Sequence, residues 1–259
     1  MLQNPVSLDE LCSSFPNVPR ESIANLMRNL QQYQIVEAVS DDSVLPMNVA
    51  VLGLGSLGSH IVQQISMLGL CSLTLIDDDI VEYDNIYRQI YTLADVGKTK
   101  SSVLAHRESR VPIRNPVEQK VTSADDLIAI LQEYSCNLVI QAADEPSAGE
   151  VAEYVWVAAD QLNIPYITIP GYVGNVVGFP EFYYPRQIYR HTYQREYTTD
   201  NLLFMHSLQK IPFRTCSILG ATVARQIDDY MHEHTPYGYG HRGFFHENEE
   251  RWQTRRIFE

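Results

Sequence analysis

The stretch Val49-Ala-Val-Leu-Gly53-Leu-Gly55-Ser-Leu-Gly58 decides the fold, because a mostly apolar run leads directly into a glycine-rich turn and then into an amphipathic pattern. Residues 48–52 predict a parallel strand that is buried on both faces. Residues 56–68 carry apolar side chains at helical spacing and predict a helix. A G-x-G-x-x-G motif between a strand and a helix is the context in which these glycines indicate a nucleotide site.

Each glycine of this motif has an expected task. Gly53 would permit the tight turn, Gly55 would let the backbone approach a phosphate, and Gly58 would allow close packing of the helix. The N-terminus of the helix would offer N–H groups to an anion. Asp77, at the end of the next expected strand, could accept hydrogen bonds from a ribose hydroxyl pair. NAD and ATP satisfy these residues equally well.

Beyond the glycine motif, expected strands alternate with expected helices. This alternation predicts an α/β fold with a Rossmann-like, mostly parallel sheet that has helices on both faces. Ligands of such sheets bind at the carboxyl ends of the strands. Residues 186–212 are expected to face the substrate, and the tail after Thr235 has no assignable pattern. The expected strands are 73–76, a short one near Val117, 137–141 and 166–169, with further β structure at 171–178 and 182–184, and the expected helices are 98–110, 124–133, 146–162 and 216–231.

Residues 1–46 form a separate small module in this interpretation, and residues 47–259 form the nucleotide-binding domain. The module is winged-helix-like, with helices over 8–15 and 21–32, a strand over 35–39 and a linker from 41 to 46. DNA binding is disfavoured because the second helix carries few cations. Capture of a peptide on the strand edge and a plain packing or dimerisation role remain the alternatives.

Composition narrows the classes of function. The chain has 259 residues, 45% of them hydrophobic, and a formal net charge of −13, which argues against a general nucleic-acid surface. No apolar run approaches the ~20 residues that span a bilayer, so no membrane partner is expected. The four cysteines form no C-x-x-C pair, so neither zinc nor a disulfide framework is expected. These features predict a soluble, cytoplasmic protein.

The charged residues favour ATP over NAD. Arg88 and Lys100 are expected near the carboxyl edge of the sheet, where two cations beside a glycine loop suit a triphosphate. Asp144 follows the strand 137–141 at the same edge, where its carboxylate could hold Mg²⁺ directly or through water. A nicotinamide enzyme would usually supply Tyr-x-x-x-Lys, and none of the lysines has a tyrosine four residues before it.

The series Asp77-Asp-Asp-x-Val-Glu-x-x-Asn85-x-x-Arg88-Gln89, followed by Lys100, resembles the ThiF/MoeB and ubiquitin-activating-type adenylating enzymes. The resemblance runs from about residue 49 to 184 and resumes at Cys216. It implies homodimers in which a carboxylate attacks ATP to make an acyl-adenylate. The implied roles are ribose binding or pocket shaping for Asp77 and Asp79, phosphate contacts for Asn85, Arg88, Gln89 and Lys100, and positioning of Mg²⁺ for Asp144.

Residues 171–180 and 183–185 are similar to the branch of this family that modifies ribosomally made peptides. The resemblance implies a precursor peptide as partner, with the N-terminal module as a clamp for its leader, and a place in antibiotic biosynthesis. The expected function is therefore ATP-dependent adenylation or phosphorylation of a peptide carboxylate, with Arg88, Lys100 and Asp144 as catalytic residues. The alternatives are adenylation of a sulfur-carrier C-terminus, a nucleotide-binding protein without turnover, and an NAD-linked dehydrogenase.

The chain also departs from the family pattern. It lacks the two C-x-x-C pairs that hold zinc in many relatives, and residues 41–47 lack the arginine segment that commonly precedes the glycine loop. Cys216 opens an apolar helix and is expected to be a buried small side chain rather than an acyl acceptor. His232 and His234 lack a third partner for a metal site.

Overall fold

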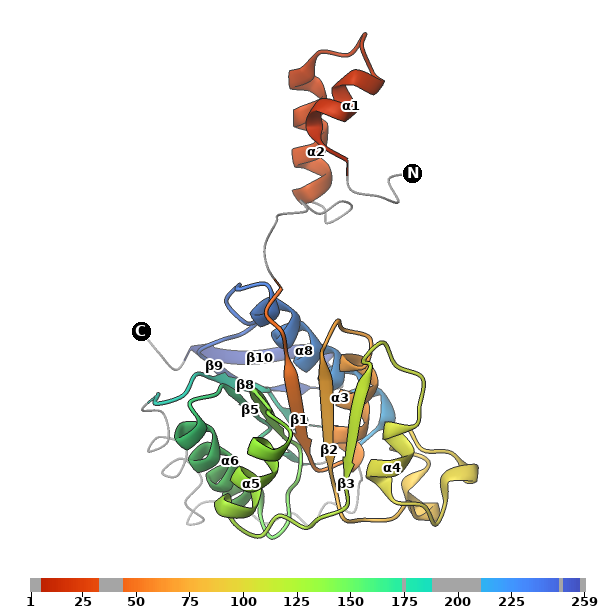
Figure 1. Ribbon diagram of the computed structural model, residues 1–259, viewed down its shortest axis with the longest axis vertical. Helices are drawn as coiled ribbons and strands as arrows, with labels where there is room; N and C mark the ends of the chain where they lie inside the picture. The colour runs from red at the N-terminus through yellow and green to blue at the C-terminus, as the bar shows by residue number, and fades with distance from the viewer. Residues whose placement is uncertain (1–5, 33–43, 174–175, 188–210, 247–248, 257–259) are drawn as a thin grey trace. The chain divides into compact units, whose positions relative to one another are not determined.

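The computed structural model describes residues 6–32, 44–173, 176–187, 211–246 and 249–256. The chain divides into two compact units, Met1–Val44 and Leu45–Glu259, and each is described here by itself (Figure 1).

The first unit contains two helices, α1 (Leu8–Ser14) and α2 (Arg20–Gln32). Ser7 begins α1 with a capping box, in which its hydroxyl accepts from the Glu10 N–H at 3.2 Å and its own N–H donates to the Glu10 carboxylate at 2.8 Å. Both predicted helices are therefore present. The predicted strand 35–39 lies outside the described residues, so the winged-helix assignment stays a prediction.

The second unit is built on a six-stranded sheet in the order β3-β2-β1-β4-β5-β8. The first five of these strands are parallel, and β8 pairs antiparallel with β5, which confirms the predicted α/β fold with a mostly parallel sheet. The strands β1 to β4 end at one common edge. Their bounds are β1 (Asn48–Leu52), β2 (Ser72–Ile76), β3 (Ile113–Val117), β4 (Leu138–Gln141), β5 (Tyr166–Thr168) and β8 (Glu181–Tyr183).

Helices cover both faces of this sheet (Figure 1). Val49 and Val51 of β1 belong to a core cluster shared with three helices, α3 (Ser56–Ile65), α4 (Lys100–Ala105) and α8 (Phe213–Met231). Ala50 and Leu52 point to the opposite cluster, shared with α5 (Ala124–Glu133) and α6 (Ala148–Leu162). Alternate residues of one apolar strand thus fill two separate cores, as expected for a strand buried on both faces.

The bounds of one predicted helix differ clearly from those observed. The prediction 98–110 was wrong at both ends, since α4 covers only Lys100–Ala105. The reason is a tertiary contact: Val81 N–H donates to the Lys98 carbonyl at 2.8 Å, and a β-bridge joins Ile80 to Thr99. These contacts pair Thr99 with the crossover that leaves β2, so the helix begins only at Lys100. Two 3₁₀ turns, Tyr83–Asn85 and Leu93–Asp95, lie in that crossover.

A second, antiparallel sheet has the order β10-β9-β7-β6. The strands β6 (Tyr172–Val173) and β7 (Val176–Gly178) were predicted as β structure, whereas the hairpin of β9 (His241–His246) and β10 (Arg251–Arg256) was not. The sequence of this hairpin does not alternate clearly between apolar and polar residues, so it gave no strand signal. Arg242 of β9 is buried and donates from Nε to Glu181 Oε1 of β8 at 2.7 Å, which ties the two sheets together. No helix in the described part of the chain is long and apolar enough to cross a membrane.

Candidate functional site

A cavity with a volume of about 470 Å³ lies at the carboxyl ends of β1 to β4. All but one of the sequence-predicted site residues line it, although they come from five different segments of the chain. The exception is Gly58, which packs beneath the loop. The residues that line the cavity as predicted are Gly53, Gly55, Asp77, Asp79, Asn85, Arg88, Gln89, Lys100 and Asp144.

The glycine loop explains why glycine stands at these positions. Gly53 has a φ of +88°, and a Cβ there would lie 2.4 Å from the Ala143 nitrogen. A Cβ at Gly58 would lie 1.8 Å from the Gly53 carbonyl oxygen, so neither position admits a side chain. Gly55, in contrast, has no neighbouring atom within 4 Å of such a Cβ and faces open space. Gly55 is the N-cap of α3 and provides no side-chain cap, so an anion can approach the first N–H groups of that helix.

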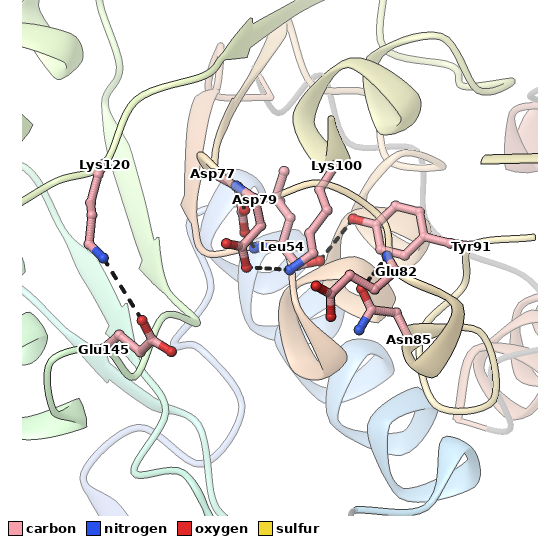
Figure 2. A network of polar contacts seen from close by, with 9 residues as sticks. All are labelled: Leu54, Asp77, Asp79, Glu82, Asn85, Tyr91, Lys100, Lys120 and Glu145. Carbon is pink, nitrogen blue, oxygen red and sulfur yellow. Dashed lines mark hydrogen bonds and ion pairs between the residues drawn. The ribbon is translucent and has the colours of Figure 1, made fainter. Parts of the chain in front are cut away.

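The peptide groups of Leu54 are held from two sides (Figure 2). Its N–H donates to Asp77 Oδ2 at 2.5 Å, and its carbonyl accepts from the buried Tyr91 hydroxyl at 2.8 Å. Asp77 Oδ1 accepts from the Asp79 N–H at 2.8 Å. Burial raises the pKa of Asp77, and the nearby Lys100 ammonium opposes that rise. Asp77 therefore fixes the glycine loop, and each of its oxygens keeps a further lone pair for a ligand.

Lys100 lies in the cavity wall, and its side chain is only 7% exposed. Its Nζ is 2.6 Å from Asp79 Oδ2, and its backbone N–H donates to the Asp79 carbonyl at 3.0 Å (Figure 2). This double contact holds the ammonium in one position, and two of its three donors remain for a ligand. Lys98 is exposed, precedes α4 and is not among the lining residues.

A short turn brings Asn85, Arg88 and Gln89 to the same wall. Asn85 is buried, its Oδ1 accepts from the Glu82 N–H at 3.0 Å, and its carbonyl accepts from the N–H groups of Arg88 at 3.2 Å and Gln89 at 2.9 Å. The Gln89 side chain is 3% exposed, and its Oε1 has no hydrogen-bond partner among the described residues. A buried amide oxygen without a partner is costly, so this group is suited to contact a bound molecule.

The acidic side chains suit a hard cation with oxygen ligands. Six carboxylates line the cavity, against the three cations Arg88, Lys100 and Lys120. Carboxylate oxygens of Asp77, Asp78 and Asp79 lie within 4.8 Å of one another, but two of these residues already hold the glycine loop and Lys100. Asp144 is exposed at the end of β4 and lines the same cavity. The donor set fits Mg²⁺, and neither Asp78 nor Asp144 has a hydrogen bond or ion pair among those found in the described residues. The six carboxylates are Asp77, Asp78, Asp79, Glu82, Asp144 and Glu145.

The sequence reasoning missed the opposite rim of the cavity. Lys120 follows β3 and Glu145 follows β4, and their Nζ and Oε2 atoms are 3.9 Å apart (Figure 2). Gln119 and Val121 line the same side. The signal was available, because residues just beyond the ends of neighbouring parallel strands meet at one edge of the sheet.

Two other candidate groups lie apart from this chemistry. Cys216 is fully buried, and burial raises the pKa of its thiol to about 12, which confirms that it is a buried small side chain. The rings of His232 and His234 stack with centroids 6.4 Å apart. Neither histidine belongs to the aspartate group, which is the one potential metal cluster in the described parts of the chain.

Comparison with known proteins places this cavity in context. The model of the ThiF family matches residues 26–258. The adenylyltransferase and sulfurtransferase MOCS3 of Arabidopsis thaliana is 32% identical over 107 residues, 40% of this chain and 23% of the relative. The tRNA threonylcarbamoyladenosine dehydratase of Escherichia coli is 32% identical over 137 residues, 50% of this chain and 48% of the relative. The chain thus spans less than half the length of these curated relatives.

Solved structures share the fold over nearly the whole chain. Escherichia coli MccB, crystallised with AMPCPP and MccA, has a TM-score of 0.71 and 18% identity, covering 98% of this chain and 83% of MccB. PaaA has a TM-score of 0.65 and 20% identity, covering 93% of this chain and 85% of PaaA. At this level of identity the likeness concerns the fold. Since the family model covers most of the sequence, this chain belongs to the ThiF family.

Proposed function

We propose that this protein uses ATP and Mg²⁺ to activate a carboxylate by adenylation. The observation that carries the proposal is the convergence of the glycine loop, the Asn85–Gln89 turn, Lys100 and Asp144 on one cavity. The family supports it, because several relatives are named adenylyltransferases.

The side chains present account for the steps of this reaction. The substrate carboxylate attacks the α-phosphorus of ATP, a new C(O)O–P bond forms, and the bond to pyrophosphate breaks, which gives an acyl-adenylate. Lys100 and Arg88 neutralise charge that develops on the phosphates, and no side-chain nucleophile is needed. Mg²⁺ held by Asp144 would add charge neutralisation on the phosphate oxygens. The buried Cys216 takes no part.

The remaining site residues bind the nucleotide in this proposal. The first N–H groups of α3 receive a phosphate, and Asp77 and Asp79 border the ribose. The attraction between the buried Lys100 ammonium and the phosphates is expected to be strong, because solvent and salt screen buried charges less than surface charges. The proposed ATP-binding residues are Gly53, Gly55, Gly58, Asp77, Asp79, Asn85, Arg88, Gln89 and Lys100.

A peptide is the substrate that we infer, with a homodimer as the active form and a role in antibiotic biosynthesis in the cytoplasm. The support is the fold shared with MccB, whose structure was determined with the peptide MccA. A sulfur-carrier protein is the second candidate, because a relative 27% identical over 164 residues is a ThiS adenylyltransferase. The first unit, Met1–Val44, would clamp the leader of the peptide.

Two measurements test the nucleotide and the reaction. ATP with Mg²⁺ is expected to raise the melting temperature, because a ligand that binds only the native state stabilises it. Stabilisation by NAD and not by ATP would refute the proposal. Release of pyrophosphate with the correct substrate indicates adenylation, whereas release of ADP indicates phosphorylation of the carboxylate.

Deletion of residues 1–40 tests whether the first unit binds the peptide substrate. The shortened protein is expected to bind ATP as the full chain does, since the cavity lies within the second unit. Its affinity for the precursor peptide, to be sought in a short neighbouring reading frame, is expected to fall at least about tenfold. Unchanged peptide affinity would make the first unit a packing module. Mass spectrometry of the peptide after incubation with ATP identifies the activated carboxylate.

A further inference from the structure

A buried histidine behind the cavity joins three elements that the proposed function needs. His60 of α3 is fully buried and does not line the cavity. Its Nε2 lies 3.1 Å from the Arg88 carbonyl oxygen, and its Nδ1 lies 3.0 Å from Ser217 Oγ of α8. The helix that starts at the glycine loop, the turn that carries Arg88, and α8 therefore meet at one imidazole ring.

The chemistry of the partners assigns the tautomer. A carbonyl oxygen only accepts, so Nε2 carries the proton and donates to Arg88. Nδ1 is then an acceptor for the Ser217 hydroxyl, whose single proton is shared between Nδ1 and the Phe213 carbonyl oxygen 3.1 Å away. Burial lowers the pKa of His60, which favours the neutral ring that this pattern requires. Both polar atoms of the ring are satisfied, which offsets the cost of burying them.

The surroundings leave the ring little freedom. Phe213 packs edge-on against it, with ring centroids 4.4 Å apart. A Cβ at Gly220 would lie 2.7 Å from the His60 carbonyl oxygen, so α8 approaches α3 closely only because this residue is glycine. The direction in which His60 donates is therefore fixed by packing on α8.

From these contacts we infer that His60 is a positioning residue, which holds the Arg88–Gln89 turn in the orientation that presents both side chains to the phosphates. The inference rests on the proposed function for the identity of the ligand. Asn85 holds the start of the turn, and Arg107 Nη1 donates to the Ile90 carbonyl at 2.8 Å just beyond its end. His60 supplies a further anchor between these two, at the carbonyl of the residue that faces the cavity. Without it, the peptide group between Arg88 and Gln89 would lose its contact to α3.

Binding of ATP and adenosine, measured by calorimetry with Mg²⁺, separates positioning from general stability. His60→Phe keeps a flat ring but removes the N–H donor. This variant is expected to bind ATP about tenfold more weakly than the wild type, whereas its affinity for adenosine should change little because adenosine lacks phosphates. His60→Gln retains an N–H donor and is expected to recover most of the affinity for ATP. Equal loss of ATP and adenosine would reduce His60 to a packing residue and overturn the inference.

A double-mutant cycle gives a second readout. In an Arg88→Ala background, His60→Phe is expected to have a smaller effect on ATP binding than in the wild type, because the two residues act through one contact. Fully additive losses would contradict the coupling. Ser217→Ala is the matched control, since it removes the other partner of the ring and leaves the bond to Arg88 in place.

Hydrogen exchange in the nucleotide-free protein tests the anchor without ATP. The Gln89 N–H, which donates to the Asn85 carbonyl at 2.9 Å, is expected to exchange about tenfold faster in His60→Phe than in the wild type. Unchanged exchange would refute the anchor even if ATP binds. If ATP fails to bind the wild-type protein while exchange responds as expected, the proposed function fails and the local anchor stands.

Discussion

The two sides of the cavity differ in how firmly they hold their lysines. Lys100 has a side chain that is 7% exposed and an Nζ 2.6 Å from Asp79, whereas Lys120 is 57% exposed with its Nζ 3.9 Å from Glu145. Figure 2 shows one pair within a network of polar contacts and the other alone on the opposite rim. Charge that is held in place before the ligand arrives stabilises a transition state more than charge that must first be ordered. We therefore expect the Lys100 side of the cavity, rather than the Lys120 side, to contact the reacting phosphates.

The largest expected effect is at the buried side of the cavity. Lys100→Ala and Arg88→Ala are each expected to lower turnover by about 10²-fold or more, the usual loss when one fixed charge stabiliser is removed. Turnover is measured as pyrophosphate release, and circular dichroism checks the fold. Lys98→Ala is the control, because Lys98 is exposed and does not line the cavity. A larger loss for Lys98 than for Lys100 would show that the residue roles are misassigned.

Asp144→Asn is expected to have the next largest effect. Exchange of a charged carboxylate for a neutral amide should raise the Mg²⁺ concentration needed for half-maximal turnover by at least about tenfold, with little change in melting temperature because Asp144 is exposed. The neighbouring Glu145→Gln is the matched control and should shift the Mg²⁺ titration much less. If the Mg²⁺ titrations of the two variants are the same, then Asp144 is not a specific ligand of the metal.

The buried side is also where the sequence predicted most. Glycines, cations and strand ends follow local patterns, and parallel strands force their carboxyl ends to one edge. The sequence therefore predicted the sheet and, on this wall, the glycines of the loop and both cations. It could not predict that Asp77 holds the Leu54 N–H or that His60 reaches Arg88, because those contacts join segments more than 20 residues apart in sequence.

Tertiary contacts explain the other failures of the sequence reasoning. The start of α4 was misplaced because residues 98 and 99 pair with the crossover from β2 instead of continuing the helix. The hairpin of β9 and β10 was missed because its partner, β7, lies more than 60 residues earlier and supplies the pairing that its own pattern does not predict. Lys120 was overlooked because it belongs to no local motif, and only its place just beyond the end of β3 indicates that it lines the cavity.

Substitutions on the exposed rim, at Lys120 and Glu145, should have only small effects on turnover. Lys120→Ala is expected to change turnover and ATP affinity by at most about fivefold, because an exposed ion pair contributes roughly 0–1 kcal/mol. The same measurements on Glu145→Gln should give an effect of similar size, since each change breaks one long contact. A loss at Lys120 as large as that at Lys100 would overturn the comparison and place phosphate chemistry on both sides of the cavity.

The smallest expected effect concerns the anchor behind the buried side. Burial lowers the pKa of His60 below its ordinary value of 6.5, so the unfolded chain takes up a proton at a higher pH than the native protein does. The free energy of unfolding should therefore decrease as the pH falls from 7.5 through 6.5, and this contribution should be absent in His60→Gln. Urea unfolding at pH 7.5 and 5.5 measures the difference, and carboxylates such as Asp77 contribute equally to both proteins. If the two proteins lose stability equally on acidification, then His60 is not the source of that loss. The stability data would then give no support for a neutral His60 ring in the folded protein.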